Sequence, residues 1–176
     1  MKKFILIMLV ALAGCEQHHD NDNDHENENG MEHKVLTLPD VFSYAGKKPV
    51  LGNNEMLETV IAFNEKLSSK DSDMGHLLAD SVTLHLSDGL NTTISSDSLQ
   101  AMIGEYFTEY ENIDITINAA IPVVYEDISH VWVYSWIHEK LESKDGTTES
   151  FYLHEDFRLE NGKIREVFTF KRLAGN

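Results

Sequence analysis

The stretch EDFRLENGKIREVFTF, residues 155–170, decides the fold because it encodes two amphipathic strands joined by a tight turn. Asn161 and Gly162 form the preferred sequence of a two-residue β-hairpin loop. A loop of fixed length sets the pairing of the two strands, and the pairing decides which side chains share a face of the sheet. The sequence therefore predicts an antiparallel hairpin with strands over about 150–160 and 163–171.

One face of this hairpin is predicted to point into the core. Its members alternate along both strands: Leu153, Glu155, Phe157, Leu159, Ile164, Glu166, Phe168 and Phe170. Glu155 and Glu166 are acidic residues on this otherwise apolar face. A lone buried carboxylate is costly, so such side chains reach the rim, pair with a cation or line a cavity. Both glutamates are therefore candidate pocket residues.

A stripe of aromatic and imidazole side chains lies on a strand predicted over 130–142. Its members are His130, Trp132, Tyr134, Trp136 and His138. A two-residue loop at Asp145-Gly146 places Trp136 opposite Glu155 and turns the stripe toward the core. A three-residue loop with a glycine bulge pairs Trp136 with His154 instead, and Val131, Val133 and Ile137 then face the core. We prefer the first register, which predicts a pocket lined by Trp132, Tyr134, Trp136, His138, Glu155, Phe157, Glu166 and Phe168.

The remaining elements predict an α+β fold. Apolar spacing indicates helices over about 54–68, around 74–80, and after Asp97, where Gln100 completes a capping-box-like start. Short strands are expected over 82–86 and 90–94. From Asn112 on, apolar residues recur at every second position, as in a β-strand. One face of the next strand carries Ile113, Ile115, Ile117, Ala119, Ile121 and Val123. A curved antiparallel sheet wrapped around N-terminal helices accommodates this order of elements.

The N-terminus predicts export. Cys15, the only cysteine, ends Leu12-Ala13-Gly14-Cys15 behind two lysines and an apolar run that is too short to span a bilayer. The tetrapeptide resembles a bacterial lipobox. That resemblance implies a signal peptide over 1–14, acylation of Cys15 with chains such as palmitate, and, since Glu16 follows, the outer membrane facing the periplasm. An ordinary signal peptide that happens to contain a cysteine is the alternative.

Residues 15–33 predict an acylated cysteine followed by a disordered tether, ahead of a folded domain over 34–176. Residues 16–33 hold seven acids, four asparagines and no basic residue, so they have little to bury. Their four histidines, His18, His19, His25 and His33, are weak candidates for metal capture, because their spacing matches no closed tetrahedral site. The formal net charge of −16 argues against nucleic acid as a partner. We expect no cofactor.

Three segments together resemble the SnoaL-like branch of the nuclear transport factor 2-like superfamily. They are LADSVTLHLSDG at 78–89, SDSLQAMIGEYFTEY at 96–110 and EDFRLENGKIREVFTF at 155–170. The resemblance covers about 54–172 and implies a cone-like α+β barrel with a pocket between sheet and helices, and frequent dimers through the sheet. Members of the superfamily include polyketide cyclases, ketosteroid isomerase, epoxide hydrolases, dehydratases and proteins that have a pocket but no catalytic activity.

Transfer of catalytic residues from that family is incomplete. The oxyanion-hole acid of ketosteroid isomerase falls on Glu155. Its general base falls on Leu86, and its helix-borne tyrosine on Ala62 or Phe63, which argues against an isomerase of that type. His85, beside the base position, is expected at the surface or a sheet edge.

Three functions remain after this comparison. The first is binding of a small, partly apolar ligand or partner segment in the pocket by a lipid-anchored envelope protein. The second is general acid/base catalysis of a cyclase, dehydratase or hydrolase type, with Glu155, Glu166 and His138 as candidate catalytic residues. The third is a structural role in an envelope assembly as a homodimer. The missing catalytic pair favours binding.

Overall fold

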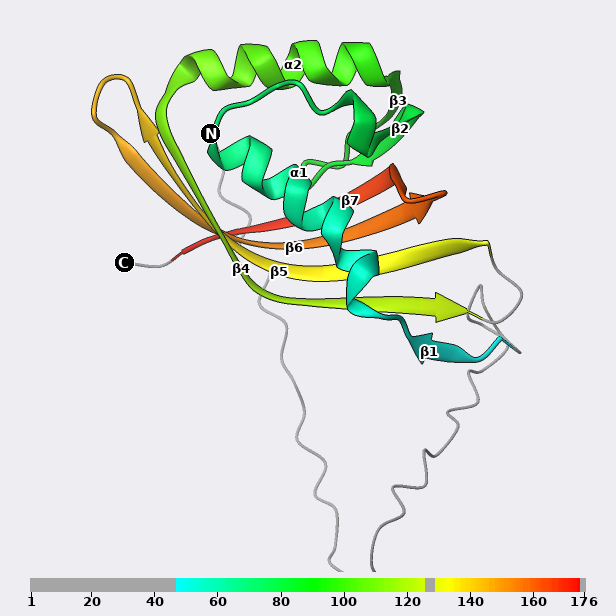
Figure 1. Ribbon diagram of the computed structural model, residues 1–176. Coiled ribbons are helices and arrows are strands. Elements are labelled where there is room, and N and C mark those ends of the chain that lie inside the picture. Colours follow the sequence, from blue (N-terminus) through cyan, green and yellow to red (C-terminus); the bar gives the residue numbers. More distant parts are fainter. Residues whose placement is uncertain (1–46, 126–128, 175–176) are drawn as a thin grey trace, which may run out of the picture. The chain divides into compact units, whose positions relative to one another are not determined.

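The computed structural model describes residues 47–125 and 129–174, which belong to one compact unit (Figure 1). The elements in chain order are β1 (Pro49–Leu51), the 3-10 helix η1 (Asn54–Leu57), α1 (Glu58–Ser68), the 3-10 helix η2 (Gly75–Leu77), β2 (Leu78–His85), β3 (Asn91–Ser95), α2 (Ser96–Glu109), β4 (Tyr110–Tyr125), β5 (His130–Ser143), β6 (Thr148–Glu160) and β7 (Lys163–Leu173). The predicted signal peptide, Cys15 and the histidine-rich tether lie outside the described residues.

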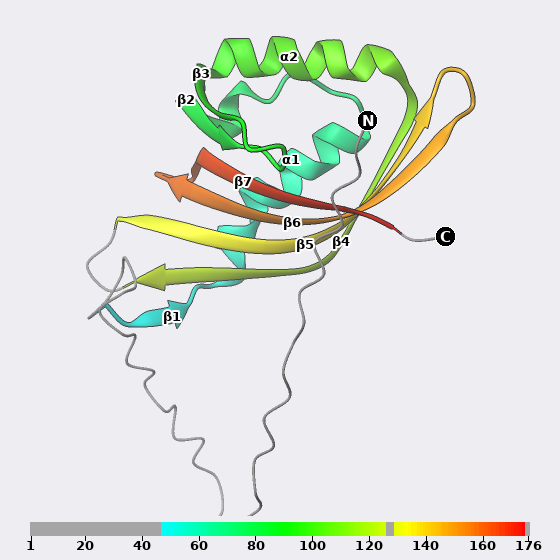
Figure 2. The ribbon, with the colours of Figure 1, turned by 180° about the vertical axis from the view of Figure 1, so that it is seen from behind.

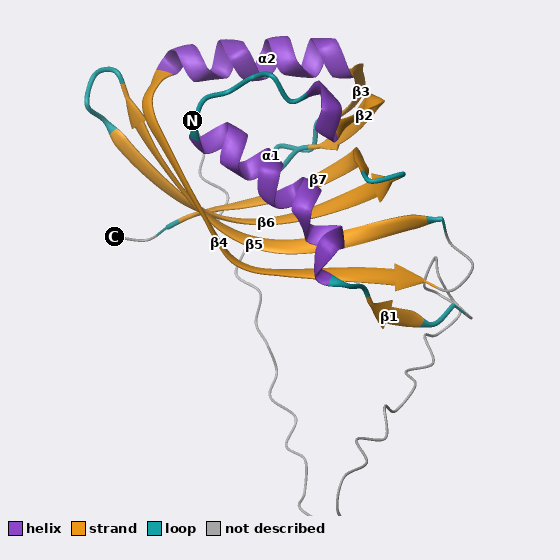
Figure 3. Cartoon of the chain, viewed as in Figure 1, coloured by secondary structure: helices purple, strands orange, loops and turns teal. Residues whose placement is uncertain are grey.

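The seven strands form one curved sheet in the order β1-β4-β5-β6-β7-β2-β3. Neighbouring strands are antiparallel except for β2 and β7, which are parallel. Figures 1 and 2 show the long strands bending around α1, with α2 on the same side of the sheet. We call this side the concave face and the opposite side the convex face. Both main helices precede the four long strands β4–β7 in the chain, and Figure 3 shows helices and a mainly antiparallel sheet, so the predicted α+β class is confirmed.

The helices differ from the predicted ones mainly at their ends. A 3-10 turn precedes α1, and the short helix predicted after it is the single turn η2. The N-cap of α2 is Ser95, whose Oγ accepts a hydrogen bond of 3.1 Å from the backbone N–H of Ser98. Gln100 does not close a capping box, because its Oε1 accepts from the backbone N–H of Met74.

The loop between β5 and β6 has three residues, so the preferred register is wrong and the alternative register is correct. Trp136 pairs with His154. A two-residue loop of the predicted kind needs a positive φ at both central residues. Gly146 has a φ of 84°, but Asp145 is not among the residues with positive φ. Asp145 Oδ1 instead accepts a 2.9 Å hydrogen bond from the N–H of Thr147 and stabilises the longer loop.

The hairpin between β6 and β7 has the predicted turn but an unpredicted bulge. Asn161 and Gly162 both have positive φ, at 52° and 75°, as a two-residue loop requires. Leu159 pairs with Ile164, but Arg158 then pairs with Glu166, so Arg165 is an extra residue. A bulge of one residue moves every later side chain to the other face. The core-facing positions predicted for Glu166, Phe168 and Phe170 are therefore wrong.

A second bulge interrupts β4. Ile117 pairs with Ile137 of β5, whereas Ala119 pairs with Trp136, which leaves Asn118 as the extra residue. The sequence predicts one shared face for the six apolar residues of this strand, and Ile113, Ile115 and Ile117 lie on the concave face. Ala119, Ile121 and Val123 move to the convex face, contrary to the prediction, and Ile121 is 39% exposed.

The hydrophobic core lies between the concave face and the two main helices. Its most buried members include Val60, Leu99, Val133, Ile137, Leu141, Phe157 and Ile164. Phe63 of α1 contacts the ring of Phe157 edge-on, with ring centroids 6.0 Å apart. Within 47–125 and 129–174, no helix has the length and apolar character needed to cross a membrane.

Candidate functional site

A cavity of about 340 Å³ lies among α1, α2, β2 and the concave face of the sheet. Most of its wall is apolar, with side chains from both helices and from β2, β6 and β7. The polar side chains that line it are Ser87, Tyr106, Glu139, Glu155, Thr169 and Lys171. A mainly apolar hollow with a few converging polar groups is typical of small-molecule sites.

Glu155 is the deepest charged group of this cavity. It lies on β6 between Ser135 of β5 and Thr169 of β7. Its Oε1 accepts a 3.1 Å hydrogen bond from Thr169 Oγ1, the one hydrogen bond that its carboxyl group receives within the described residues. Burial raises the pKa of Glu155 to about 7, against the opposing effect of the Thr169 hydrogen bond, and the charge of Glu139 adds to the increase.

Glu139 of β5 is a second carboxyl group in the same cavity. Burial raises its pKa, while the charge of Lys171 and a hydrogen bond with the Tyr106 side chain act in the opposite direction. The pKa of Tyr106 on α2 is also raised, mainly by burial and then by the charge of Glu139. Two acids and a phenol therefore face one space.

Lys171 is the one basic side chain that lines the cavity among the described residues. Its Nζ lies 3.4 Å from the centroid of the Phe151 ring, in cation–π geometry. Its charge lowers the pKa of Glu139 but is not among the causes of the Glu155 shift. Glu155 consequently has no cationic partner supplied by the described part of the chain.

Of the predicted pocket residues, the structure places Glu155 alone at the cavity. Phe157 is on the concave face but is completely buried in the core. The other six predicted residues are placed on the convex face by the three-residue loop and by the bulge at Arg165; they are Trp132, Tyr134, Trp136, His138, Glu166 and Phe168. His138 Nε2 lies 2.7 Å from Ser150 Oγ there.

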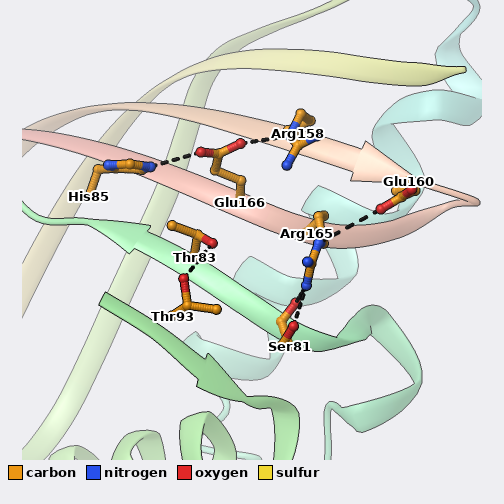
Figure 4. Close-up of polar contacts among 8 residues, drawn as sticks. All are labelled: Ser81, Thr83, His85, Thr93, Arg158, Glu160, Arg165 and Glu166. Carbon is orange, nitrogen blue, oxygen red and sulfur yellow. Dashed lines mark hydrogen bonds and ion pairs between the residues drawn. The ribbon is translucent and has the colours of Figure 1, made fainter. Parts of the chain in front are cut away.

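Glu166 is paired on the convex face rather than exposed to a cavity (Figure 4). Its Oε1 lies 2.8 Å from His85 Nε2, and its Oε2 lies 2.6 Å from Arg158 Nε. The ring of His85 stacks on Phe168 at a centroid distance of 3.9 Å, and its Nδ1 lies 2.8 Å from Asn91 Oδ1. The surface role expected for His85 agrees with this position, and Glu166 has the cationic partner that Glu155 lacks.

The bulge that reverses Glu166 is held by Arg165. Its guanidinium group donates hydrogen bonds to the backbone carbonyl and Oγ of Ser81 on β2, and it lies 3.8 Å from Glu160 (Figure 4). These contacts link the extra residue of β7 to the neighbouring parallel strand.

Glu139 lines the cavity and is absent from the pocket that the sequence predicts. The alternation of Val131, Val133 and Ile137 could have indicated it, because Glu139 comes two residues after Ile137 and lies on the same face. The cavity also brings together the positions to which the isomerase residues transfer: Leu86 and Phe63 line it together with Glu155. Because two of these three positions are apolar, the cavity does not reproduce that set of donors and base.

Comparison with solved structures shows an NTF2-like, ketosteroid isomerase-like fold. An M. tuberculosis LEH-like epoxide hydrolase is 16% identical at a TM-score of 0.53, covering 67% of this chain and 83% of that chain. A putative aromatic ring hydroxylase from Novosphingobium aromaticivorans has a TM-score of 0.60 at 14% identity, covering 69% of this chain and 90% of that chain. A hypothetical protein with a ketosteroid isomerase-like fold from Catenulispora acidiphila, in complex with trimethylamine, has a TM-score of 0.51 at 18% identity, covering 64% of this chain and 84% of that chain. At these identities the likeness concerns the fold.

Comparisons at the level of sequence give no match, either with models of protein families or with curated proteins. Within the described residues, no group of three or more His, Cys, Asp or Glu side chains gathers in a way that suits a metal ion. The site is therefore defined by the geometry of the cavity itself.

Proposed function

We propose that the domain binds a small, partly apolar molecule in the cavity between the helices and the concave face. The observation that carries this proposal is Glu155, a partly buried carboxyl group that lines an apolar cavity and to which the described residues offer one hydrogen-bond donor and no cation. Such a group costs folding free energy, and proteins retain this kind of cost at sites where the group serves a function. Binding a ligand at its unpaired side is the use that the geometry supports best.

The dimensions of the site agree with a ligand of one ring or a short chain. A volume of about 340 Å³ is at the lower end of the range of small-molecule sites. The fold is shared with a protein named as an epoxide hydrolase, a class that acts on small molecules, which adds support by analogy.

A general acid/base enzyme is the second candidate, and the two carboxyl groups favour it. A group with a pKa of about 7 can both donate and accept a proton at neutral pH, and Glu139 offers a second acid or base in the same cavity. Glu166 and His138 are not available for this chemistry because they lie on the other face of the sheet. Turnover of the bound molecule would distinguish catalysis from binding.

Native mass spectrometry of the purified full chain tests the proposal. We expect a bound small molecule in the wild type and its loss in Glu155→Gln, because that change removes the ionisable group. Glu166→Gln is the matched control on the convex face and should retain the ligand. Equal occupancy in wild type and Glu155→Gln would contradict the assignment of Glu155.

We also propose that the chain is a lipoprotein of the bacterial envelope, anchored at Cys15 and held off the membrane by residues 16–33. The support is the N-terminal sequence pattern. Labelling of cells with a fatty-acid analogue should mark the wild type and not Cys15→Ser. Equal labelling of both would refute acylation at this position.

The convex face is proposed as the surface of a homodimer. It exposes large side chains, with Trp136 40%, Tyr152 43% and Phe170 57% accessible. Contiguous exposed aromatic side chains are typical of interaction surfaces. Sedimentation of wild type and Trp136→Lys should give a dimer and a monomer respectively, whereas a wild-type monomer at micromolar concentration would contradict the proposal.

A further inference from the structure

We infer that the ligand of this cavity is a small organic cation, a protonated amine on an apolar ring or chain, with Glu155 and Glu139 receiving its positive nitrogen. The inference rests on the binding function proposed above and adds the chemical class of the ligand. Its basis is that two carboxyl groups, from neighbouring strands β5 and β6, face the same apolar-walled space.

The bonding of Glu155 is incomplete on the side of the cavity. Thr169 donates to Oε1, and no hydrogen bond to Oε2 is made by the described residues. A carboxylate in an apolar surrounding is stabilised most by a positive group in contact with it. A ligand ammonium group beside Oε2 would provide both the charge and a hydrogen-bond donor.

No basic side chain within 47–125 and 129–174 is paired with Glu155. Lys171 lines the cavity, but its Nζ lies over the Phe151 ring and its charge acts on Glu139. With both carboxyl groups ionised, the lining keeps an excess of negative charge. The ionised state of Glu155 therefore favours a positive ligand and disfavours an anion.

The aromatic side chains of the lining suit the same ligand class. Phe63 and Tyr106 both border the cavity, and ring faces attract organic cations. The apolar wall around them buries the rest of the molecule. An alkylated or aryl amine of one ring thus satisfies each part of the lining.

The affinity of a neutral ligand and the affinity of an amine should change with pH in opposite directions. A neutral ligand would accept a hydrogen bond from protonated Glu155 and would bind less tightly as Glu155 ionises. An amine keeps its charge up to a pH of about 10 and needs the ionised carboxylate, so its affinity should rise as pH increases through 7. The other titratable groups that face this space are Glu139, Tyr106 and Lys171, and they should change the slope of the pH dependence but not its sign.

Three probes of one shape separate these cases: phenethylamine, 2-phenylethanol and phenylacetate. Their binding to the purified full chain is measured by calorimetry at pH 5.5 and 8.5. We expect phenethylamine to bind about ten-fold more tightly at the higher pH and at least about ten-fold more tightly there than the neutral probe. Glu155→Gln should abolish this preference, and Glu166→Gln should preserve it.

Each result supports or overturns the inference. Equal or tighter binding of 2-phenylethanol or phenylacetate at pH 8.5 would overturn the cationic class while leaving the cavity function intact. Binding of none of the probes would count against the cavity function itself. Retention of the amine preference in both Glu155→Gln and Glu139→Gln would show that the cation binds elsewhere.

Discussion

Glu155 on the concave face and Glu166 on the convex face differ in whether their carboxyl groups have a cationic partner. On the concave face Glu155 lies in an apolar cavity with a single hydrogen-bond donor. On the convex face Glu166 lies between His85 and Arg158 at 2.8 and 2.6 Å. A paired acid supports the structure, whereas an unpaired buried acid costs free energy. The difference supports a structural role for Glu166 and the ligand-binding role proposed for Glu155.

The largest expected difference between the two faces is in the stability lost when a buried or an exposed isoleucine is replaced by alanine. Ile137 is 1% exposed on the concave face, and Ile121 is 39% exposed on the convex face. We expect Ile137→Ala to lower the free energy of unfolding by about 2–5 kcal/mol and Ile121→Ala by less than about 1 kcal/mol. Urea denaturation of both variants measures this. Similar losses would mean that β4 has no bulge at Asn118.

The next effect concerns Glu155 and depends on pH. Its pKa is higher in the folded chain than in the unfolded chain, so the folded state binds more protons between about pH 4.5 and 7. Wild-type stability should fall as pH rises through that window, and the loss should be absent in Glu155→Gln. The variant should be more stable by up to about 3 kcal/mol at pH 8.5 and equally stable at pH 4. Thermal unfolding at both pH values tests it; a less stable variant at pH 8.5 would contradict the account.

A smaller effect of opposite sign is expected for Glu166→Gln. This change removes the carboxylate that lies between His85 and Arg158. The partly buried ion pairing of Glu166 is worth about 1 kcal/mol. The variant should be less stable than wild type at pH 7, and ligand occupancy should not change. A stabilised Glu166→Gln would remove the distinction between the two acids.

The sequence predicts the elements better than it predicts the faces. The order of helices and strands follows from apolar periodicity and turn residues, and the strands from β4 on agree with it to within a few residues. Glu155 was placed correctly because β6 is uninterrupted and shares alternation with Phe157. Glu166 was misplaced because Arg165, before it, is an extra residue.

The same reason explains the other errors in the predicted site. One residue more or less in a loop or strand reverses every side chain that follows. The extra residue at Asn118 reversed Ile121, and the longer loop at Lys144-Asp145-Gly146 reversed the aromatic stripe and concealed Glu139. Contacts from other strands, such as that of Arg165 with Ser81, hold a bulge in place, and a pattern within one strand does not contain them.

An unpaired Glu155 carboxyl group in an apolar cavity has a raised pKa. Carboxyl-carbon NMR titration of the full chain, with Glu155→Gln used to assign the signal, measures it most directly. We expect a titration midpoint near 7 for Glu155, and a lower midpoint when an amine is bound. A midpoint near the ordinary value of about 4.3 would contradict it, since the carboxylate would then be solvated or paired and the cavity would lack its chemical basis.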